Sequence, residues 1–163
     1  YVYLGDQQPS EGGVIKNAVD YSGTTTAKLY REKSTTSSSV RLACKTAINT
    51  SKWLNEIDVK KAYHLGTYNY RVIAGSPFLS EHSFATAIDI RALDNANIIE
   101  HWNDKGDKGG KLKQAASKAC KYFSNVLTPD YNADHYDHFH LDNGPGLAKF
   151  QYWFRIGPCD YKK

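Results

Sequence analysis

The chain has 163 residues with 40% hydrophobic and 23% charged side chains, which is the length and composition of one globular domain. Its 12 Tyr, 6 Phe and 3 Trp exclude a wholly disordered chain, and the lack of an apolar run of roughly 20 residues excludes a membrane span. The formal net charge of +4 suits an anionic partner, but the lysines are scattered, so nucleic-acid binding is not expected.

Residues 1–39 show little hydrophobic pattern. Clusters of Ser and Thr, together with Gly and Pro, indicate loop structure there. We therefore expect an N-terminal extension over residues 1–39, packed on or near a folded domain of residues 40–163. Apolar residues at helical spacing begin at Val40 and predict the first helix, with a serine at positions 37–39 as its N-cap.

Helices and strands are mixed in the rest of the chain. A second helix is predicted from Trp53 to about Tyr63. Segments rich in Tyr, Val and Ile predict strands at 68–74 and 85–92. An apolar stripe predicts a helix over 112–127, and alternating residues predict a strand at 136–142. The sequence therefore predicts an α+β fold in which helices flank a small antiparallel sheet.

Three histidines, His135, His138 and His140, lie in or beside the last predicted strand. Because side chains alternate along a strand, His138, His140 and Asp142 share one face, while Phe139 lies on the other. Two adjacent imidazoles are costly if both are charged, whereas an imidazole that binds a metal is neutral. The pattern therefore predicts metal binding or catalysis on the polar face.

A second polar cluster precedes it in the chain. His82 falls in the loop before the strand predicted at 85–92, and Asp89 projects from the polar face of that strand. One excursion of the chain can therefore bring an imidazole and a carboxylate to the same ion. Together with His140 they supply two His ligands, one carboxylate and an open position, which is the ligand set of a catalytic zinc site. His82, Asp89 and His140 are therefore candidate ligands of a Zn²⁺ ion.

Two motifs, SEHSFATAIDI from Ser80 and HYDHFHLD from His135, resemble the extensin-like C-terminal domain family of bacterial zinc peptidases. Both motifs look like those of the wider group that includes lysostaphin, the D-Ala-D-Ala peptidases and the hedgehog domain. The second motif is also similar to that of the penicillin-insensitive murein endopeptidases. The resemblance covers about Cys44 to Cys159, and it implies a zinc peptidase that acts on peptidoglycan.

The resemblance also implies roles beside the three ligands. His138 is the expected catalytic imidazole, and His135 is a second imidazole nearby. Asp137 competes with His138 for the role of general base, because some relatives carry a Glu at the same offset from the last ligand. We favour His138, since His138 shares the strand face of His140 and Asp137 is expected to point away.

Two further polar residues have more than one interpretation. Arg71 and Ser80 are candidates for holding a substrate carboxylate or carbonyl. The alternatives are an ordinary surface ion pair for Arg71 and a loop cap for Ser80. His64 is expected at the end of the second predicted helix, where a cation is mildly favoured.

The main functional hypothesis is a zinc-dependent peptidase that hydrolyses stem or cross-link peptides of peptidoglycan at a D-Ala bond, as an endopeptidase or a carboxypeptidase. The alternative is a module that keeps the zinc site and binds a cell wall or a protein without hydrolysis. A hydrolase of another amide is the third hypothesis. We expect a secreted protein, periplasmic or extracellular, that is a monomer and has a peptidoglycan peptide as its partner.

The three cysteines, Cys44, Cys120 and Cys159, do not form the CxxC pairs of thiolate zinc sites. Cys120 lies on the apolar stripe of its predicted helix, and the aromatic tail that contains Cys159 has to fold back to be buried. We therefore predict a Cys120–Cys159 disulfide with Cys44 free. Because Cys44 also lies on an apolar helical face, a buried thiol is one interpretation of it.

Overall fold

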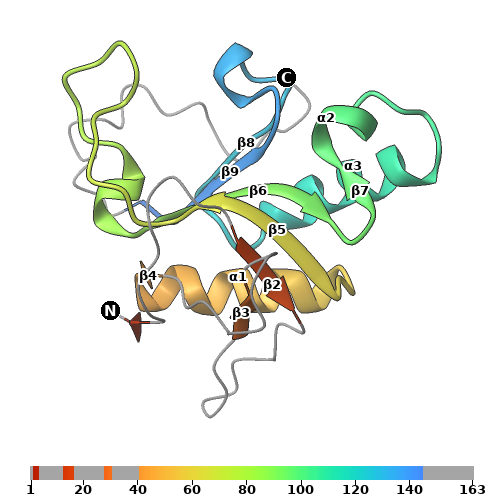
Figure 1. Ribbon diagram of the computed structural model, residues 1–163, viewed down its shortest axis with the longest axis horizontal. Helices are drawn as coiled ribbons and strands as arrows, with labels where there is room; N and C mark the ends of the chain where they lie inside the picture. Colours follow the sequence, from red (N-terminus) through yellow and green to blue (C-terminus); the bar gives the residue numbers. More distant parts are fainter. Residues whose placement is uncertain (1, 4–12, 17–27, 31–40, 145–163) are drawn as a thin grey trace.

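The computed structural model describes residues 2–3, 13–16, 28–30 and 41–144. These segments form the predicted α+β fold, built on an antiparallel sheet (Figure 1). Its strands run in the order β3-β2-β5-β6-β9-β8, and β7 also pairs with β6. They are β2 (Gly13–Lys16), β3 (Lys28–Tyr30), β5 (Lys61–Gly66), β6 (Ala87–Leu93), β7 (Ala96–Asn97), β8 (Asn125–Leu127) and β9 (Phe139–Asp142). The short strands β1 (Val2–Tyr3) and β4 (Arg41–Leu42) pair with each other.

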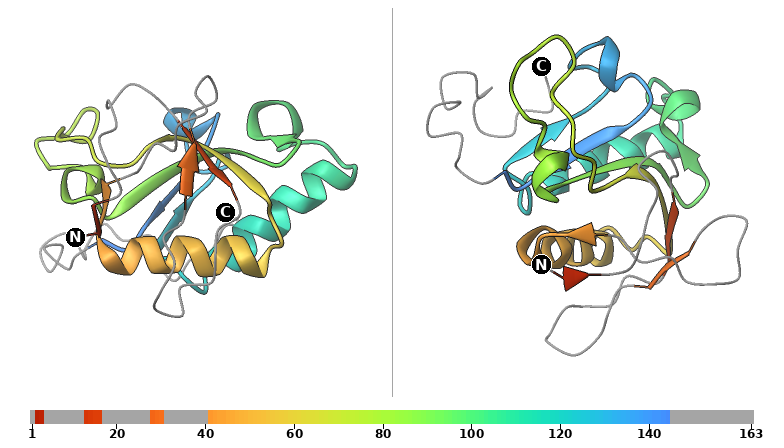
Figure 2. Two further views of the ribbon diagram at one scale, coloured as in Figure 1. Left: turned by 60° about the horizontal axis from the view of Figure 1, so that its bottom comes forward. Right: turned by 60° about the vertical axis from the view of Figure 1, so that its left-hand side comes forward.

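The two long helices of the described segments have 13 residues each and share the hydrophobic core with the sheet. They are α1 (Cys44–Glu56) and α3 (Asp107–Ala119), and their buried apolar residues belong to the same hydrophobic cluster as those of the sheet. The shorter elements are the helix α2 (Ile98–His101) and the 3-10 turns η1 (Glu81–Phe84) and η2 (Ala133–His135). In the right-hand view of Figure 2, α1 lies below the sheet, and the loop of residues 67–80 stands above it.

The hydrophobic core lies between the sheet and these helices. Ile88 and Ile90 of β6, and Phe139 and Leu141 of β9, have no exposed surface. They point to one side because alternate residues of a strand share a face. Trp53 of α1 is also fully buried, and its indole Nε1 donates a hydrogen bond of 2.9 Å to a carbonyl of α3. The residues between these apolar positions face the other side of the sheet, which confirms the alternation predicted for both strands.

The predicted second helix is wrong. A single helix, α1, continues through Trp53, and the chain then reverses at Asp58, whose φ of 51° is in the left-handed region. Residues 61–66 follow as β5, in which Ala62 and His64 are buried in alternation. His64 is therefore a buried strand residue and not the exposed end of a helix.

The strand predicted at 68–74 is also wrong. Residues 67–80 form a loop in which only Val72 and Leu79 make an isolated bridge. Tyr70 is 72% exposed and Val72 is 50% exposed. Apolar and aromatic composition suggested a strand, but no neighbouring strand in the described part of the chain covers these side chains.

Three element boundaries differ from the prediction. The helix α3 ends at Ala119, and Leu127 lies in the separate strand β8. Strand β9 begins at Phe139, three residues after the predicted start at Tyr136. The N-cap of α1 is Ala43, which makes no side-chain cap hydrogen bond. The prediction of a serine N-cap is therefore wrong.

Parts of the predicted N-terminal extension join the sheet. Strand β2 pairs with β5, where Val14 lies opposite Tyr63, and β3 pairs with β2. The division of the chain between residues 1–39 and 40–163 stays a prediction. No helix in the described segments combines the length and the apolar character of a membrane span.

The cysteines agree in part with the prediction. Cys120 is disulfide-bonded, and Cys44 is a free thiol. The interpretation of Cys44 as a buried thiol is wrong, because Cys44 is exposed at the start of α1. Cys159 and the aromatic tail lie outside the described residues, so the pairing of Cys159 with Cys120 stays a prediction.

Candidate metal centre

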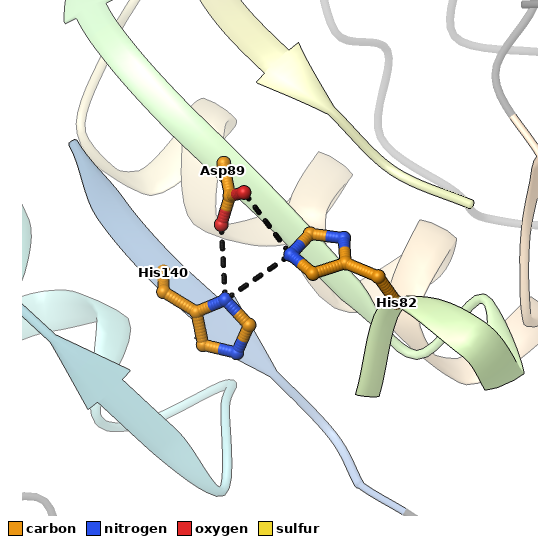
Figure 3. Close-up of side chains that lie close together, drawn as sticks. All are labelled: His82, Asp89 and His140. Carbon is orange, nitrogen blue, oxygen red and sulfur yellow. Dashed lines mark hydrogen bonds and ion pairs between the residues drawn. The ribbon is translucent and has the colours of Figure 1, made fainter. Parts of the chain in front are cut away.

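The pairing of β6 with β9 places Asp89 directly opposite His140. Opposite side chains of an antiparallel pair lie on the same face, so the carboxylate and the imidazole meet, with 2.9 Å between Asp89 Oδ1 and His140 Nδ1. His82 comes from η1, and its Nε2 lies 3.0 Å from Asp89 Oδ2 and 3.3 Å from His140 Nδ1. Figure 3 shows the three side chains converging from η1 and the two strands.

The 3-10 turn η1 holds His82 in position. Ser80 caps the turn, because its Oγ accepts a hydrogen bond from the backbone amide of His82 at 3.4 Å. The turn ends at Ala85, whose φ of 58° is in the left-handed region. The carbonyl of His82 accepts a bond from the amide of Asn69, which joins η1 to the 67–80 loop. His82 is therefore fixed and buried, with 2% of its surface exposed.

The imidazoles of His82 and His140 are each held by a second acceptor on the far side of the ring. Nδ1 of His82 donates to the carbonyl of Thr67 at 2.5 Å, which leaves Nε2 to face Asp89. Nε2 of His140 donates to Asp142 Oδ2 at 3.2 Å, which leaves Nδ1 to face Asp89. Such bonds fix the orientation of a ring and determine which of its nitrogens can bind a metal.

Asp89 and His140 form a partly buried charged pair, with 13% and 12% of their side-chain surfaces exposed. Burial raises the pKa of Asp89, but the hydrogen bonds from His140 and His82 outweigh burial and hold this pKa well below its usual range. Burial lowers the pKa of His140, but its bonds to Asp142 and Asp89 outweigh burial and raise this pKa to about 10. The centre therefore favours a positive charge, and a metal ion that binds here replaces a proton.

The donor atoms suit a metal ion. One nitrogen from each of His82 and His140 and one carboxylate oxygen of Asp89 all lie within 4.8 Å of one another. Imidazole and carboxylate are ligands of zinc and of other divalent transition metals. These three side chains therefore form a group that could hold a metal ion, and they are the three that the sequence predicts as ligands.

His138 and Asp137 lie beside this group as a hydrogen-bonded pair. Nδ1 of His138 lies 2.7 Å from Asp137 Oδ1, and its Nε2 lies 3.6 Å from Asp89 Oδ1. The other oxygen of Asp137 lies 3.8 Å from Arg91 Nη2. Both residues precede β9, so the strand alternation assumed for them does not apply. Asp137 therefore lies beside His138 and Arg91, on the side of the sheet that carries His140, contrary to the expectation that it points away from that face.

His135 lies on the same side, at the end of η2. Its Nδ1 is 2.6 Å from Asn132 Oδ1, and its ring centroid is 5.1 Å from that of His138 and 5.9 Å from that of His140. Burial, and then the electrostatic influence of the neighbouring imidazoles His140 and His138, lower the pKa of His135 to about 4. His135 is therefore neutral at pH 7, next to the metal-binding group.

Arg71 and Ser80 lie in different surroundings. Ser80 is buried and acts as the cap described above, whereas Arg71 is exposed in the 67–80 loop, with its backbone amide bonded to Ser83 Oγ at 2.9 Å. Substrate binding by Arg71 or Ser80 stays a prediction.

Sequence reasoning assigned no role to three residues around the centre: Thr67, Arg91 and Asp142. Strand alternation places Arg91 on the face of Asp89 and Asp142 on the face of His140, which is a usable signal. Thr67 contributes its backbone carbonyl, which no side-chain pattern could have indicated.

Comparison with protein families gives one match. The model of the family described as "Extensin-like protein C-terminus" matches residues 4–151, which also takes in most of residues 1–39. The resemblance noted from the motifs began only at Cys44, so the match extends further toward the N-terminus. No curated protein and no solved structure matched the chain. The chain therefore belongs to the extensin-like protein C-terminus family and carries a His/His/Asp group that could hold a metal ion.

Proposed function

We propose that this protein is a zinc-dependent peptidase that hydrolyses stem or cross-link peptides of peptidoglycan at a D-Ala bond. One observation carries the proposal. The imidazole of His138 lies beside the three metal-binding side chains, with Nε2 3.6 Å from Asp89 Oδ1, where it can act on a molecule bound at the same point. A module that only binds its partner has no need of this additional imidazole.

The donor set fits zinc, with His82, Asp89 and His140 as the residues that would hold it. Bound zinc supplies Lewis acidity, which polarises a peptide carbonyl and makes water a better nucleophile near neutral pH. The protein supplies the proton transfers and the orientation of the substrate.

His138 is suited to the role of general base. Its Nδ1–H donates to Asp137 Oδ1, so the lone pair of Nε2 is free to accept a proton from the attacking water. As the water oxygen bonds to the peptide carbon and the C–N bond breaks, His138 passes this proton to the leaving amine. Asp137 is the weaker candidate for the base, because its carboxylate is already engaged by His138 and lies near Arg91.

His135 and Arg71 are proposed to contact the substrate. The hydrogen bond from His135 Nδ1 to Asn132 leaves Nε2 of His135 as an acceptor for a substrate N–H. Arg71 lies exposed on the loop that also supplies Thr67, and it could pair with a substrate carboxylate. Ser80 is the less suitable of the two residues predicted to bind substrate, because it is buried as a cap.

The disulfide at Cys120 supports a place outside the cytoplasm. Disulfides persist in oxidising compartments such as the periplasm and the extracellular space. Peptidoglycan is found in these compartments, so the proposed substrate and the proposed location agree.

Digestion of purified peptidoglycan tests the proposed activity. Zinc-loaded protein should release peptides with newly formed carboxyl and amine ends, identified by mass spectrometry, and a chelator should stop their release. Opened cross-links would identify an endopeptidase, and free D-Ala a carboxypeptidase. Protein that binds both zinc and peptidoglycan without forming any product would instead support the binding module and contradict a peptidase.

A further inference from the structure

His140 is held between two carboxylates. Its Nδ1 lies 2.9 Å from Asp89 Oδ1, and its Nε2 lies 3.2 Å from Asp142 Oδ2. Figure 3 shows that the second ring nitrogen points away from Asp89. Asp142 is almost completely buried, with 2% of its surface exposed, so its carboxylate depends on protein donors in place of water.

Asp142 is itself fixed by neighbouring donors. Asn125 of β8 lies directly opposite it in the strand register, and its side-chain amide is 2.9 Å from Oδ1 and 3.1 Å from Oδ2. The backbone amide of Gly144 donates to Oδ1 at 2.9 Å. Both oxygens of Asp142 are thereby engaged, and Oδ2 is directed at the ring of His140.

We propose that Asp142, held by Asn125, is a positioning residue of the metal centre that makes Nδ1, and not Nε2, the metal ligand of His140. This inference rests on metal binding as given under the proposed function. Because a carboxylate only accepts hydrogen bonds, Asp142 requires the hydrogen of His140 to be on Nε2. Nδ1 is then left with a lone pair that is directed toward Asp89 and His82.

The two ligand histidines therefore present different nitrogens. His82 donates from Nδ1 to a neutral carbonyl and presents Nε2, whereas His140 donates from Nε2 to a charged carboxylate and presents Nδ1. Asp142 also adds a second negative charge close to the ion, beyond that of Asp89. Removal of a hydrogen-bond partner from a metal-binding imidazole typically weakens metal affinity by about 10- to 100-fold.

A zinc-affinity measurement tests the inference without any substrate. Competition with a chromophoric chelator should show that Asp142→Asn weakens zinc binding by about 10- to 100-fold. Asn125→Ala should weaken binding in the same direction by a smaller factor. Asp94→Asn is the matched control, because this carboxylate lies past the other end of β6 and bonds to Lys111 and to two backbone amides. The Asp94→Asn variant should bind zinc with the same affinity as the unsubstituted protein.

The unsubstituted protein provides a second test that does not depend on the folding of a variant. In zinc-loaded protein, nitrogen NMR of His140 should show hydrogen on Nε2 and metal on Nδ1. Zinc on Nε2, or an Asp142→Asn variant that folds and binds zinc with undiminished affinity, would overturn the inference. If zinc binds as described but peptidoglycan is not cleaved, the proposed function fails and the role of Asp142 stands. Failure of zinc binding itself would refute both.

Discussion

The two faces of the β6–β9 strand pair carry different kinds of side chain, although both faces belong to the same few paired residues. One face carries fully buried apolar residues such as Ile90 and Phe139, which pack against the helices. The other carries Asp89 and His140, which meet His82. The core therefore fixes the backbone from one side, while the same backbone sets the spacing of the donor atoms on the other.

The contrast is clearest for two histidines. His64 of β5 lies opposite Ile90 and so shares the apolar face, where burial lowers its pKa to about 4. On the polar face, bonds to two carboxylates outweigh burial and raise the pKa of His140 to about 10. The same side chain is thus neutral on one face and a charged partner of carboxylates on the other.

The largest effect is expected from removing a donor on the polar face. His140→Ala should abolish stoichiometric zinc binding and with it the peptidase activity, because only His82 and Asp89 would remain of the three donors. Elemental analysis of dialysed protein measures the zinc content. One equivalent of zinc retained by this variant would refute the assignment of His140 as a ligand.

A substitution on the apolar face should instead lower stability. Phe139 is fully buried, and its ring contacts Trp102 edge-on at 5.4 Å between centroids. Phe139→Ala should lower the free energy of unfolding by about 3–5 kcal/mol, because it leaves a cavity in the core. Urea unfolding of metal-free protein measures this change.

Tyr136→Ala is the control for Phe139→Ala, since Tyr136 is 62% exposed. It should alter the unfolding free energy by no more than about 0.5 kcal/mol. Equal losses in both variants would contradict the role of Phe139 in the core.

The buried neutral His64 predicts a dependence of stability on pH. An unfolded His binds a proton below its ordinary pKa of 6.5, whereas folded His64 binds one only near pH 4. Acid therefore favours the unfolded chain. Because of His64, the free energy of unfolding should fall by about 3 kcal/mol as the pH falls from 6.5 to 4. Urea unfolding with a chelator present, compared between the unsubstituted protein and His64→Gln, isolates this contribution. An identical pH dependence in the two proteins would count against it.

His138 should affect turnover without affecting the metal. His138→Ala should keep zinc and lower kcat by roughly 10²-fold, the usual contribution of a general base. Asp137→Ala should have a smaller effect, because it removes only the partner that orients the ring. Peptidoglycan turnover and zinc content are measured on the same preparations. An inactive Asp137→Ala variant beside an active His138→Ala variant would reverse the two roles.

Much of the site could be predicted from sequence because it depends on short-range patterns. Period-two alternation predicted the faces of β6 and β9. The positions of His82, Asp89 and His140, together with the family resemblance of the two motifs, indicated the three candidate ligands. The register that sets Asp89 opposite His140 is a long-range property, which only the folded sheet reveals.

The errors have a similar physical origin. A helix was predicted from Trp53 onward, but α1 ends and the chain turns at Asp58, which has a left-handed backbone conformation. A short polar residue can adopt this conformation, but its presence in the sequence does not predict it. The apolar residues at 68–74 fit a strand locally, but a strand needs a partner, and this segment forms a loop. The direction of Asp137 was mispredicted because β9 begins only at Phe139.

The most direct test of the central claim is a crystal structure of zinc-loaded protein with an anomalous difference map at the zinc edge. The account predicts one strong peak at bonding distance, about 2.0–2.2 Å, from His82 Nε2, His140 Nδ1 and a carboxylate oxygen of Asp89. A map with no peak at these three atoms, from protein that contains one equivalent of zinc, would contradict it.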